Sequence, residues 1–210
     1  MDHDFATPPL RVERVTLEGE HVRLEPLDEA RLDELWEVAR DPVLWRWIPF
    51  PIVSRDDLRA YVETALAGRE AGTMLPFVTV ERASGRVVGS SRFGNIVAAD
   101  HRVEIGWTWV GTPWQRSGVN SEAKLLMLDH AFGPWHCHRV EFKTDSLNEQ
   151  SRSGLLGIGA TFEGIFRNHM VTHTGRMRHS AWYSITDDDW PAVRARLVAR
   201  ISAGGRRGSE

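Results

Sequence analysis

The sequence has 210 residues, of which 41% are hydrophobic and 26% charged, and its formal net charge is -3. This length suits one globular domain, because hydrophobic cores usually divide only beyond about 250–300 residues. The near-neutral charge, with both signs mixed along the chain, argues against a nucleic-acid or membrane partner. The single cysteine, Cys137, excludes an internal disulfide framework and fits a reducing compartment.

The N-terminus carries no recognisable targeting signal. Residues 1–4 lack the basic-then-apolar pattern of a signal peptide. No apolar run approaches the roughly 20 residues that span a bilayer. We therefore expect a soluble, cytoplasmic protein with an N-terminal arm at residues 1–15, one domain at 16–203 and a disordered tail at 204–210.

The first half of the chain alternates strand and helix patterns. Asp28 is placed to cap a first helix, which Asp41-Pro42 ends. Ser54 and Asp57 resemble a capping box ahead of a second helix. Strands are expected at residues 21–25, 76–82, 86–96 and 102–110, the second and third forming a hairpin.

The second half predicts three more helices. One spans residues 118–132 and is apolar on nearly every side, as expected for a helix buried against a sheet. A short helix is expected at 148–159, and a last helix begins near Thr186. Strands are expected at residues 139–144, 161–172 and 176–186. This order predicts an α/β (α+β) fold with a mixed sheet covered on both faces.

A strand–loop–helix segment carries the first chemical signal. The strand at 102–110 leads through a short polar loop into the helix at 118–132. The first turn of that helix leaves backbone N–H groups unpaired, and its dipole favours an anion there. Gly118 allows a close approach of a ligand, and Arg116 adds positive charge. The pattern indicates a phosphate or pyrophosphate cradle, with a plain tight turn as the alternative. A nucleotide-binding P-loop is disfavoured, because residues 115–120 lack its Gly-Lys-Ser/Thr ending.

The loop and its flanks resemble a known family. Gln-Arg-Ser-Gly-Val-Asn at 115–120 resembles the Gln/Arg-x-x-Gly-x-Gly/Ala loop of the GNAT N-acetyltransferases. The likeness extends to Glu104-Ile-Gly-Trp107, Pro113-Trp114, Glu122-Ala123, Asn148-Glu-Gln-Ser151 and Leu-Gly-Ile-Gly-Ala160. The whole set is similar to the branch that contains the ribosomal-protein alanine N-acetyltransferases.

The resemblance implies one GNAT domain whose mostly antiparallel sheet splays between its fourth and fifth strands. It implies acetyl transfer from acetyl-CoA to a primary amine, a protein N-terminus or a small molecule, by direct attack in a ternary complex. No metal is implied, and homodimer formation is expected. The residues assigned to acetyl-CoA by the resemblance are Trp109 and Val110 for the pantetheine, Gln115, Arg116, Ser117, Gly118, Val119, Asn120 and Ser121 for the pyrophosphate, and Asn148 and Ser151 for the cofactor arm.

Two positions depart from the family pattern. Asn120 stands where the loop ends in Gly or Ala, and we expect acetyl-CoA to bind nevertheless, because Asn tolerates left-handed backbone better than most residues. Leu155 stands where many members place the Tyr that protonates the leaving thiolate. The missing Tyr favours an alternative function, a non-catalytic acyl-CoA-binding module.

Two residues are candidates for proton transfer. Glu104, in the central strand, is the leading candidate for the base that takes a proton from the amine, with a solvated or salt-bridged strand glutamate as the alternative. Strict alternation puts Glu104 and Thr108 on one face and Trp107 on the other, unless a bulge intervenes. Ser146 is the nearest hydroxyl for the acid, with a cap or turn role as its alternative.

An aromatic loop and a histidine pair complete the candidates. Trp45, Trp47 and Phe50 are predicted to line the acceptor side, and packing beneath the loop explains them equally well. His136-Cys137-His138 has a spacing too tight for the usual tetrahedral metal sites, so a helix-to-strand connection is expected there.

Overall fold

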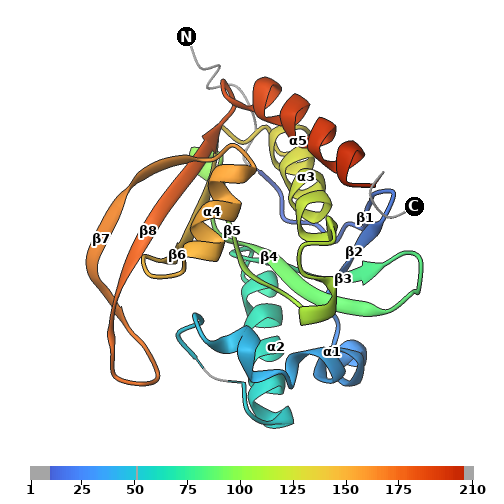
Figure 1. The fold of residues 1–210 in the computed structure, drawn as a ribbon, viewed down its shortest axis with the longest axis vertical. Coiled ribbons are helices and arrows are strands. Elements are labelled where there is room, and N and C mark those ends of the chain that lie inside the picture. The colour runs from blue at the N-terminus through green and yellow to red at the C-terminus, as the bar shows by residue number, and fades with distance from the viewer. Residues whose placement is uncertain (1–9, 51, 206–210) are drawn as a thin grey trace.

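The computed structural model describes residues 10–50 and 52–205. Its strands form one sheet in the order β1-β2-β3-β4-β5-β6-β8-β7 (Figure 1). Neighbouring strands run antiparallel except β5 and β6, which are parallel. The strands are β1 (Leu17–Glu18), β2 (Val22–Pro26), β3 (Leu75–Glu81), β4 (Val87–Val97), β5 (Arg102–Val110), β6 (Arg139–Asp145), β7 (Thr161–Val171) and β8 (Met177–Thr186).

Helices cover both faces of the sheet, so the predicted α+β architecture is confirmed (Figure 1). One core lies between the sheet and α1 and α2, and a larger one lies between the opposite face and the later helices. None of the helices in the described ranges is long and apolar enough to cross a bilayer. The helices are α1 (Leu32–Ala39), α2 (Arg55–Glu70), α3 (Val119–Phe132), α4 (Glu149–Gly157) and α5 (Trp190–Gly205).

Local sequence signals explain several element ends. Ser54 and Asp57 form the predicted capping box, in which each side chain accepts a hydrogen bond from the other residue's backbone N–H. Asp28 caps a 3-10 turn, Glu29–Arg31, that precedes α1 rather than capping α1 itself. The predicted aromatic loop, which carries Trp45, Trp47 and Phe50, begins inside another 3-10 turn, Pro42–Trp45.

The structure describes part of each predicted terminal segment. Leu10 is 7% exposed and belongs to the larger core, so the end of the expected arm is packed. The short strand β1 was not predicted. Helix α5 continues to Gly205, so the first two residues of the expected disordered tail are helical, and residues 206–210 lie outside the described ranges.

A bulge in β5 overturns the strict alternation expected for that strand. Ser90 of β4 pairs with Trp109, but Arg92 pairs with Gly106, so β5 holds one extra residue in this interval. The extra residue leaves Trp107 with a strained, left-handed backbone, at a φ of 50°. The bulge moves Trp107 to the α1–α2 face, which Glu104 also occupies, and sends the Thr108 hydroxyl toward Lys124 of α3.

The sheet opens between β5 and β6, as the resemblance implied. The two strands pair only at three positions, which end at Glu104 and Glu141. Beyond that pair, β5 continues to Val110 and β6 to Asp145 without pairing to each other. We call this gap the β5–β6 opening. Its walls are unpaired strand edges, which offer backbone hydrogen-bonding groups to a bound molecule.

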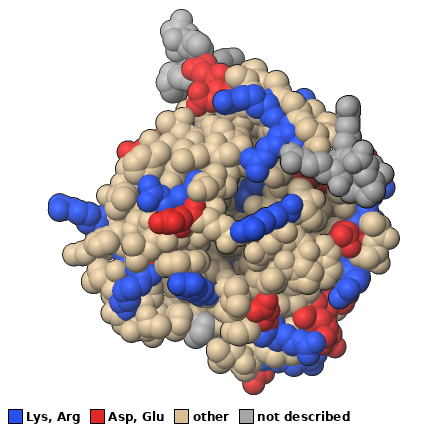
Figure 2. Space-filling model, viewed as in Figure 1, with Lys and Arg blue, Asp and Glu red and all other residues tan. Residues whose placement is uncertain are grey.

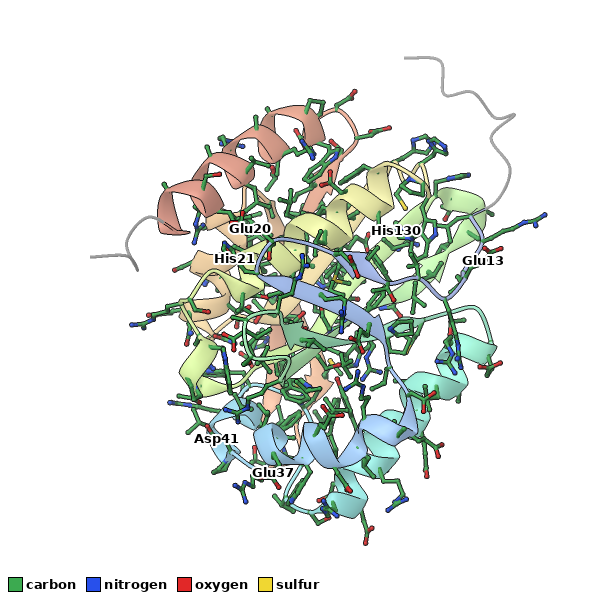
Figure 3. The ribbon with its side chains drawn as sticks, turned by 90° about the vertical axis from the view of Figure 1, so that its right-hand side faces the viewer. Glu13, Glu20, His21, Glu37, Asp41 and His130 are labelled. Carbon is green, nitrogen blue, oxygen red and sulfur yellow. The ribbon has the colours of Figure 1, made fainter. Side chains whose placement is uncertain are left out.

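The buried carboxylate of Glu122 joins the start of α3 to the turn between β1 and β2, at the β1 edge of the sheet. Glu122, in the first turn of α3, is 5% exposed and accepts hydrogen bonds from the backbone N–H groups of Glu20, His21 and Val22 at 2.7–2.8 Å. Figure 3 shows Glu20 and His21 in the turn that lies against this helix. A Cβ at Gly19 would stand 2.6 Å from the Glu122 carboxyl carbon, so only glycine fits there.

We predict that Glu122→Ala lowers the free energy of unfolding by about 3 kcal/mol, because three backbone N–H groups, of which that of Val22 is buried, lose their acceptor. Urea unfolding measures this loss. Glu149→Ala is the matched control, since Glu149 also lies in the first turn of a helix but is exposed. An equal, small loss in both variants would contradict the anchoring role of Glu122.

Candidate active site

The segment that enters α3, residues 115–118, is the predicted anion-binding cradle, and it leaves the start of that helix uncapped. Gly118 is the N-cap of α3 with φ 93°, and no side chain caps the helix among the described residues. The first-turn amides are therefore free to bind an anion. Gln115 Nε2 donates to the Val110 carbonyl at 3.0 Å and Ser117 Oγ to the Trp114 carbonyl at 2.6 Å, so both side chains hold the loop in shape.

The residues expected to bind pyrophosphate therefore fall into two groups: some have exposed side chains, and others offer only their backbone N–H groups. Arg116, with φ 64°, has an exposed side chain, as have Ser117 and Asn120. Val119 is 4% exposed, so its side chain belongs to the core and only its backbone faces the loop. Basic side chains border a hollow in the centre of the face that carries α3 and α4 (Figure 2). The charge and the free amides on this face suit a polyanion.

On the β5 side, the β5–β6 opening is bordered by the strand end that carries Trp109 and Val110. Trp109 is buried in the α1–α2 core, so only its backbone can face a ligand. The Val110 carbonyl already accepts from Gln115. Asn148 and Ser151 lie on α4, where Asn148 Oδ1 caps the helix by accepting from the Ser151 N–H at 3.1 Å. Helix α4 packs against β6, at the far wall of the opening.

Glu104 lies at the last β5–β6 pair, where the opening begins. It is 2% exposed and is not a solvated strand residue. Asn95 Nδ2 donates to its Oε2 at 2.7 Å, and Lys143 Nζ lies 3.1 Å from the same oxygen. The carboxylate is thus salt-bridged and fixed in orientation, and Oε1 accepts no hydrogen bond among the described residues.

Aromatic and basic side chains surround this carboxylate on the α1–α2 face. The Trp107 ring covers Gly94, where a Cβ would stand 2.4 Å from the indole Cζ3. Tyr61 Oη donates to the Trp107 carbonyl at 3.2 Å and so braces the bulge. The Arg92 guanidinium, 1% exposed, lies 4.3 Å from the centre of the Tyr61 ring and 5.2 Å from that of Trp107.

The predicted acceptor-side aromatics do not share one environment. Trp45 is 4% exposed, donates its indole N–H to the Ala39 carbonyl at 2.6 Å and packs in the α1–α2 core, so packing accounts for it. Trp47 and Phe50 are half-buried. The backbone N–H of His173, at the tip of the β7–β8 hairpin, donates to the Pro49 carbonyl at 3.0 Å. This bond joins two segments that are far apart in sequence.

Ser146 follows β6 directly, at the α4 end of the opening. Its N–H donates to the His179 carbonyl at 2.9 Å and its carbonyl accepts from Arg152 at 3.1 Å, so its backbone is fixed. Leu155, in the position of the family's Tyr, is 9% exposed and packs in the larger core. Its apolar environment explains why an apolar side chain stands there.

Cys137 is a core residue rather than a ligand. It is 1% exposed, and burial raises the pKa of its thiol to about 12. The rings of His101 and His138 have their centres 5.4 Å apart in a tilted arrangement, and His138 contacts Asp187. Across the described ranges, no three side chains of the metal-ligating types converge on a common point.

Sequence reasoning missed the residues that hold Glu104. Lys143 and Asn95 both contact it, although they lie on neighbouring strands. A signal for Lys143 existed: it is one of only two lysines among 26 basic residues, and it lies two positions after Glu141 on the same strand face. Asn95 carried no such signal, because its left-handed φ of 46° depends on the β4 irregularity.

The other lysine, Lys124, lies on the opposite face of the sheet. It is 5% exposed, and its Nζ donates to Thr108 Oγ1 at 2.6 Å. Desolvation lowers the pKa of its ammonium from 10.5 to about 7. The unfolded chain therefore binds more protons than the folded chain above pH 7, and the free energy of unfolding rises with pH.

We predict that the wild-type protein gains about 2 kcal/mol of stability between pH 7 and pH 9 from this one group. Lys124→Met removes the buried ammonium, so its stability is expected to be nearly flat in that interval and higher than wild type at pH 7. Denaturant unfolding at several pH values measures both slopes. Parallel slopes would show that Lys124 is not the group responsible.

A family model and several solved structures match this chain. A family model described as "Acetyltransferase (GNAT) domain" matches residues 21–161. A GCN5-related N-acetyltransferase from Brucella melitensis is 31% identical, with 93% of this chain and 90% of that chain covered and a TM-score of 0.85. RimJ of Mycobacterium smegmatis, solved in complex with CoA-disulfide, is 26% identical, with 92% and 93% covered and a TM-score of 0.74. No curated protein matches at a significant level.

The match covers the fold and the segments from which the site is built. The family model includes β5, the α3 entry and α4, and the Brucella protein aligns over nearly the whole chain. An acetyltransferase (GNAT family) from Bacillus anthracis, 20% identical with 83% of this chain and 99% of that chain covered, shares the fold at a TM-score of 0.70. The chain belongs to the GNAT family of acetyltransferases.

Proposed function

We propose that the protein transfers an acetyl group from acetyl-CoA to a primary amine, by direct attack in a ternary complex. One observation carries this proposal: β5 and β6 separate beyond Glu104, and β5 then leads through a short loop into the uncapped start of α3. A pyrophosphate at the α3 amides would direct the rest of the molecule through the opening, so that a thioester at its end meets an amine beside Glu104. RimJ of M. smegmatis binds a CoA derivative, which supports the same donor here.

Glu104 acts as the base in this mechanism. An attacking amine needs its lone pair, so its ammonium proton must leave first. Asn95 and Lys143 occupy Oε2, and Oε1 is left to accept that proton. The amine then attacks the thioester carbonyl, the C–N bond forms, and the C–S bond breaks.

The leaving thiolate takes up a proton within the opening, on the side of β6. Ser146, just beyond β6, is the candidate donor from the chain itself. Solvent serves as well, since a CoA thiolate is readily protonated, and Leu155 excludes the Tyr used elsewhere in the family.

The acceptor is a primary amine, either a protein N-terminus or a small molecule. Similarity to RimJ favours an N-terminal amine of a protein. Trp47, Phe50 and the hairpin tip at His173 are the proposed walls of its binding site, because the bond from His173 to Pro49 holds the hairpin tip against the loop that carries both aromatic residues. We also propose a cytoplasmic homodimer, in keeping with that branch.

Thiol release from acetyl-CoA, followed with a panel of small amines and of peptides with free N-termini, tests the function. At least one acceptor is expected to release CoA with saturation, and mass spectrometry then identifies the acetylated product. Tight acetyl-CoA binding with no release for any acceptor would instead support the non-catalytic acyl-CoA-binding module.

A further inference from the structure

The chain contains only two lysines, Lys124 and Lys143, while its other 24 basic residues are arginines. Both lysines lie near β5, on opposite faces of the sheet. Lys124 is enclosed behind Thr108 and Ser91, at 5% exposure. Lys143, in β6, keeps 18% of its side chain exposed on the face of Glu104. Since guanidinium groups do not accept acetyl groups under ordinary conditions, these two side chains are the chain's only lysine acceptors.

Lys143 spans the β5–β6 opening. Its backbone belongs to β6, two residues beyond the last β5–β6 pair, whereas its Nζ contacts Glu104 of β5 at 3.1 Å. The same Nζ lies 5.8 Å from the ring centre of Trp107 and 5.3 Å from that of Trp182. The amine is therefore placed where the two strands have just separated.

The surroundings of this Nζ are those of an ammonium-binding site. Two indole faces and a carboxylate within a few ångströms form a favourable environment for a cation. No other carboxylate of the described residues pairs with Lys143. The amine thus meets two conditions that the proposed mechanism sets for an acceptor, although at Oε2 rather than Oε1: it contacts the base, and it lies beside the bulge of β5.

We propose that Lys143 is an acetyl acceptor of the protein itself. This inference rests on the proposed function. The Lys143 ammonium gives one proton to Glu104, and its nitrogen attacks the carbonyl of acetyl-CoA. As the C–N bond forms, the C–S bond breaks, the nitrogen loses its second proton to the CoA thiolate, and Glu104 returns the first to solvent. The products are Nε-acetyl-Lys143, CoA and one proton.

Acetylated Lys143 no longer forms a salt bridge with Glu104. An amide nitrogen carries no charge, so acetylation ends the salt bridge at Oε2 while leaving the bond from Asn95. Lys124 lacks the two features that select Lys143, because it contacts hydroxyl groups rather than a carboxylate and lies on the far face of the sheet. The two lysines are therefore matched competitors within one chain.

Incubation of the full chain with acetyl-CoA, followed by intact-mass measurement and peptide mapping, tests the inference. One acetyl group is expected on Lys143, with a rate that saturates in acetyl-CoA and does not depend on protein concentration. Lys143→Arg should abolish the added mass, and Lys124→Met should retain it. Labelling of Lys124 in place of Lys143 would overturn the inference.

Glu104→Gln separates enzymatic from purely chemical acetylation by the sign of its effect. The variant is expected to slow labelling of Lys143 about a hundredfold, since it removes the base. Chemical acetylation would instead stay equal or speed up, because the lysine has lost its salt-bridge partner, and this result would also overturn the inference. CoA release with external amines is measured in parallel. If external amines are acetylated while Lys143 is not, the inference fails and the proposed function stands; if neither is acetylated, both fail.

Discussion

Glu104→Gln is expected to lower kcat for acetyl transfer to an external amine by about 10²–10³-fold, because glutamine keeps the shape and the contact with Asn95 but cannot accept a proton. Affinity for acetyl-CoA should change less than about threefold, since Glu104 is separated from the cradle by the rest of β5 and the loop after it. Steady-state kinetics, with the Kd of acetyl-CoA from calorimetry, measures both quantities.

Glu141→Gln is the matched control for this variant. Glu141 pairs with Glu104 across β5 and β6, is also buried, and faces the same side of the sheet. It binds Arg102 and Arg139 rather than facing the opening. Its replacement should leave kcat within a few-fold of wild type. Equal losses in the two variants would mean that strand structure, and not proton transfer, depends on these glutamates.

Gly118→Ala is expected to weaken acetyl-CoA binding by at least about tenfold. The N-cap has φ 93°, where a Cβ is strained, and no heavy atom lies within 4 Å of a Cβ added there. A methyl group there keeps phosphate oxygens away from the amides. Calorimetric titration with acetyl-CoA measures the loss.

Gly72→Ala separates the two causes of that effect. Gly72 also has a left-handed φ, 69°, and open space around an added Cβ, but it lies at the end of α2, away from the cradle. Both variants should lose about 1 kcal/mol of stability from backbone strain. Only Gly118→Ala should lose affinity. A similar loss of affinity in Gly72→Ala would argue against the cradle.

Elements were predictable where local signals are strong. The Ser54–Asp57 capping box fixes the start of α2, and the apolar pattern of residues 118–132 matches α3 within one residue. The bulge at Trp107 was not predictable, because it depends on the register in which β4 and β5 pair rather than on any local pattern. It reverses the faces of Trp107 and Thr108, and with them the identity of the side chains around Glu104.

The site was predictable in part for a similar reason. Glu104 and the loop at 115–118 lie in one continuous segment, so a single stretch of sequence carries both. The partners of Glu104 come from β4 and β6, and only the strand order brings them together. Trp45 shows the opposite case. Its place in an aromatic loop favours a role in the wall of the acceptor site, but its hydrogen bond to Ala39 and its packing on Trp109 make it part of the core.

A crystal structure of the chain with CoA tests the central claim most directly. We expect the pyrophosphate at the first-turn amides of α3 and the sulfur in the β5–β6 opening, between the Trp107 bulge and Lys143. CoA bound elsewhere, or a pyrophosphate at the α3 amides with the sulfur directed away from Glu104, would contradict the proposed path of the acetyl group.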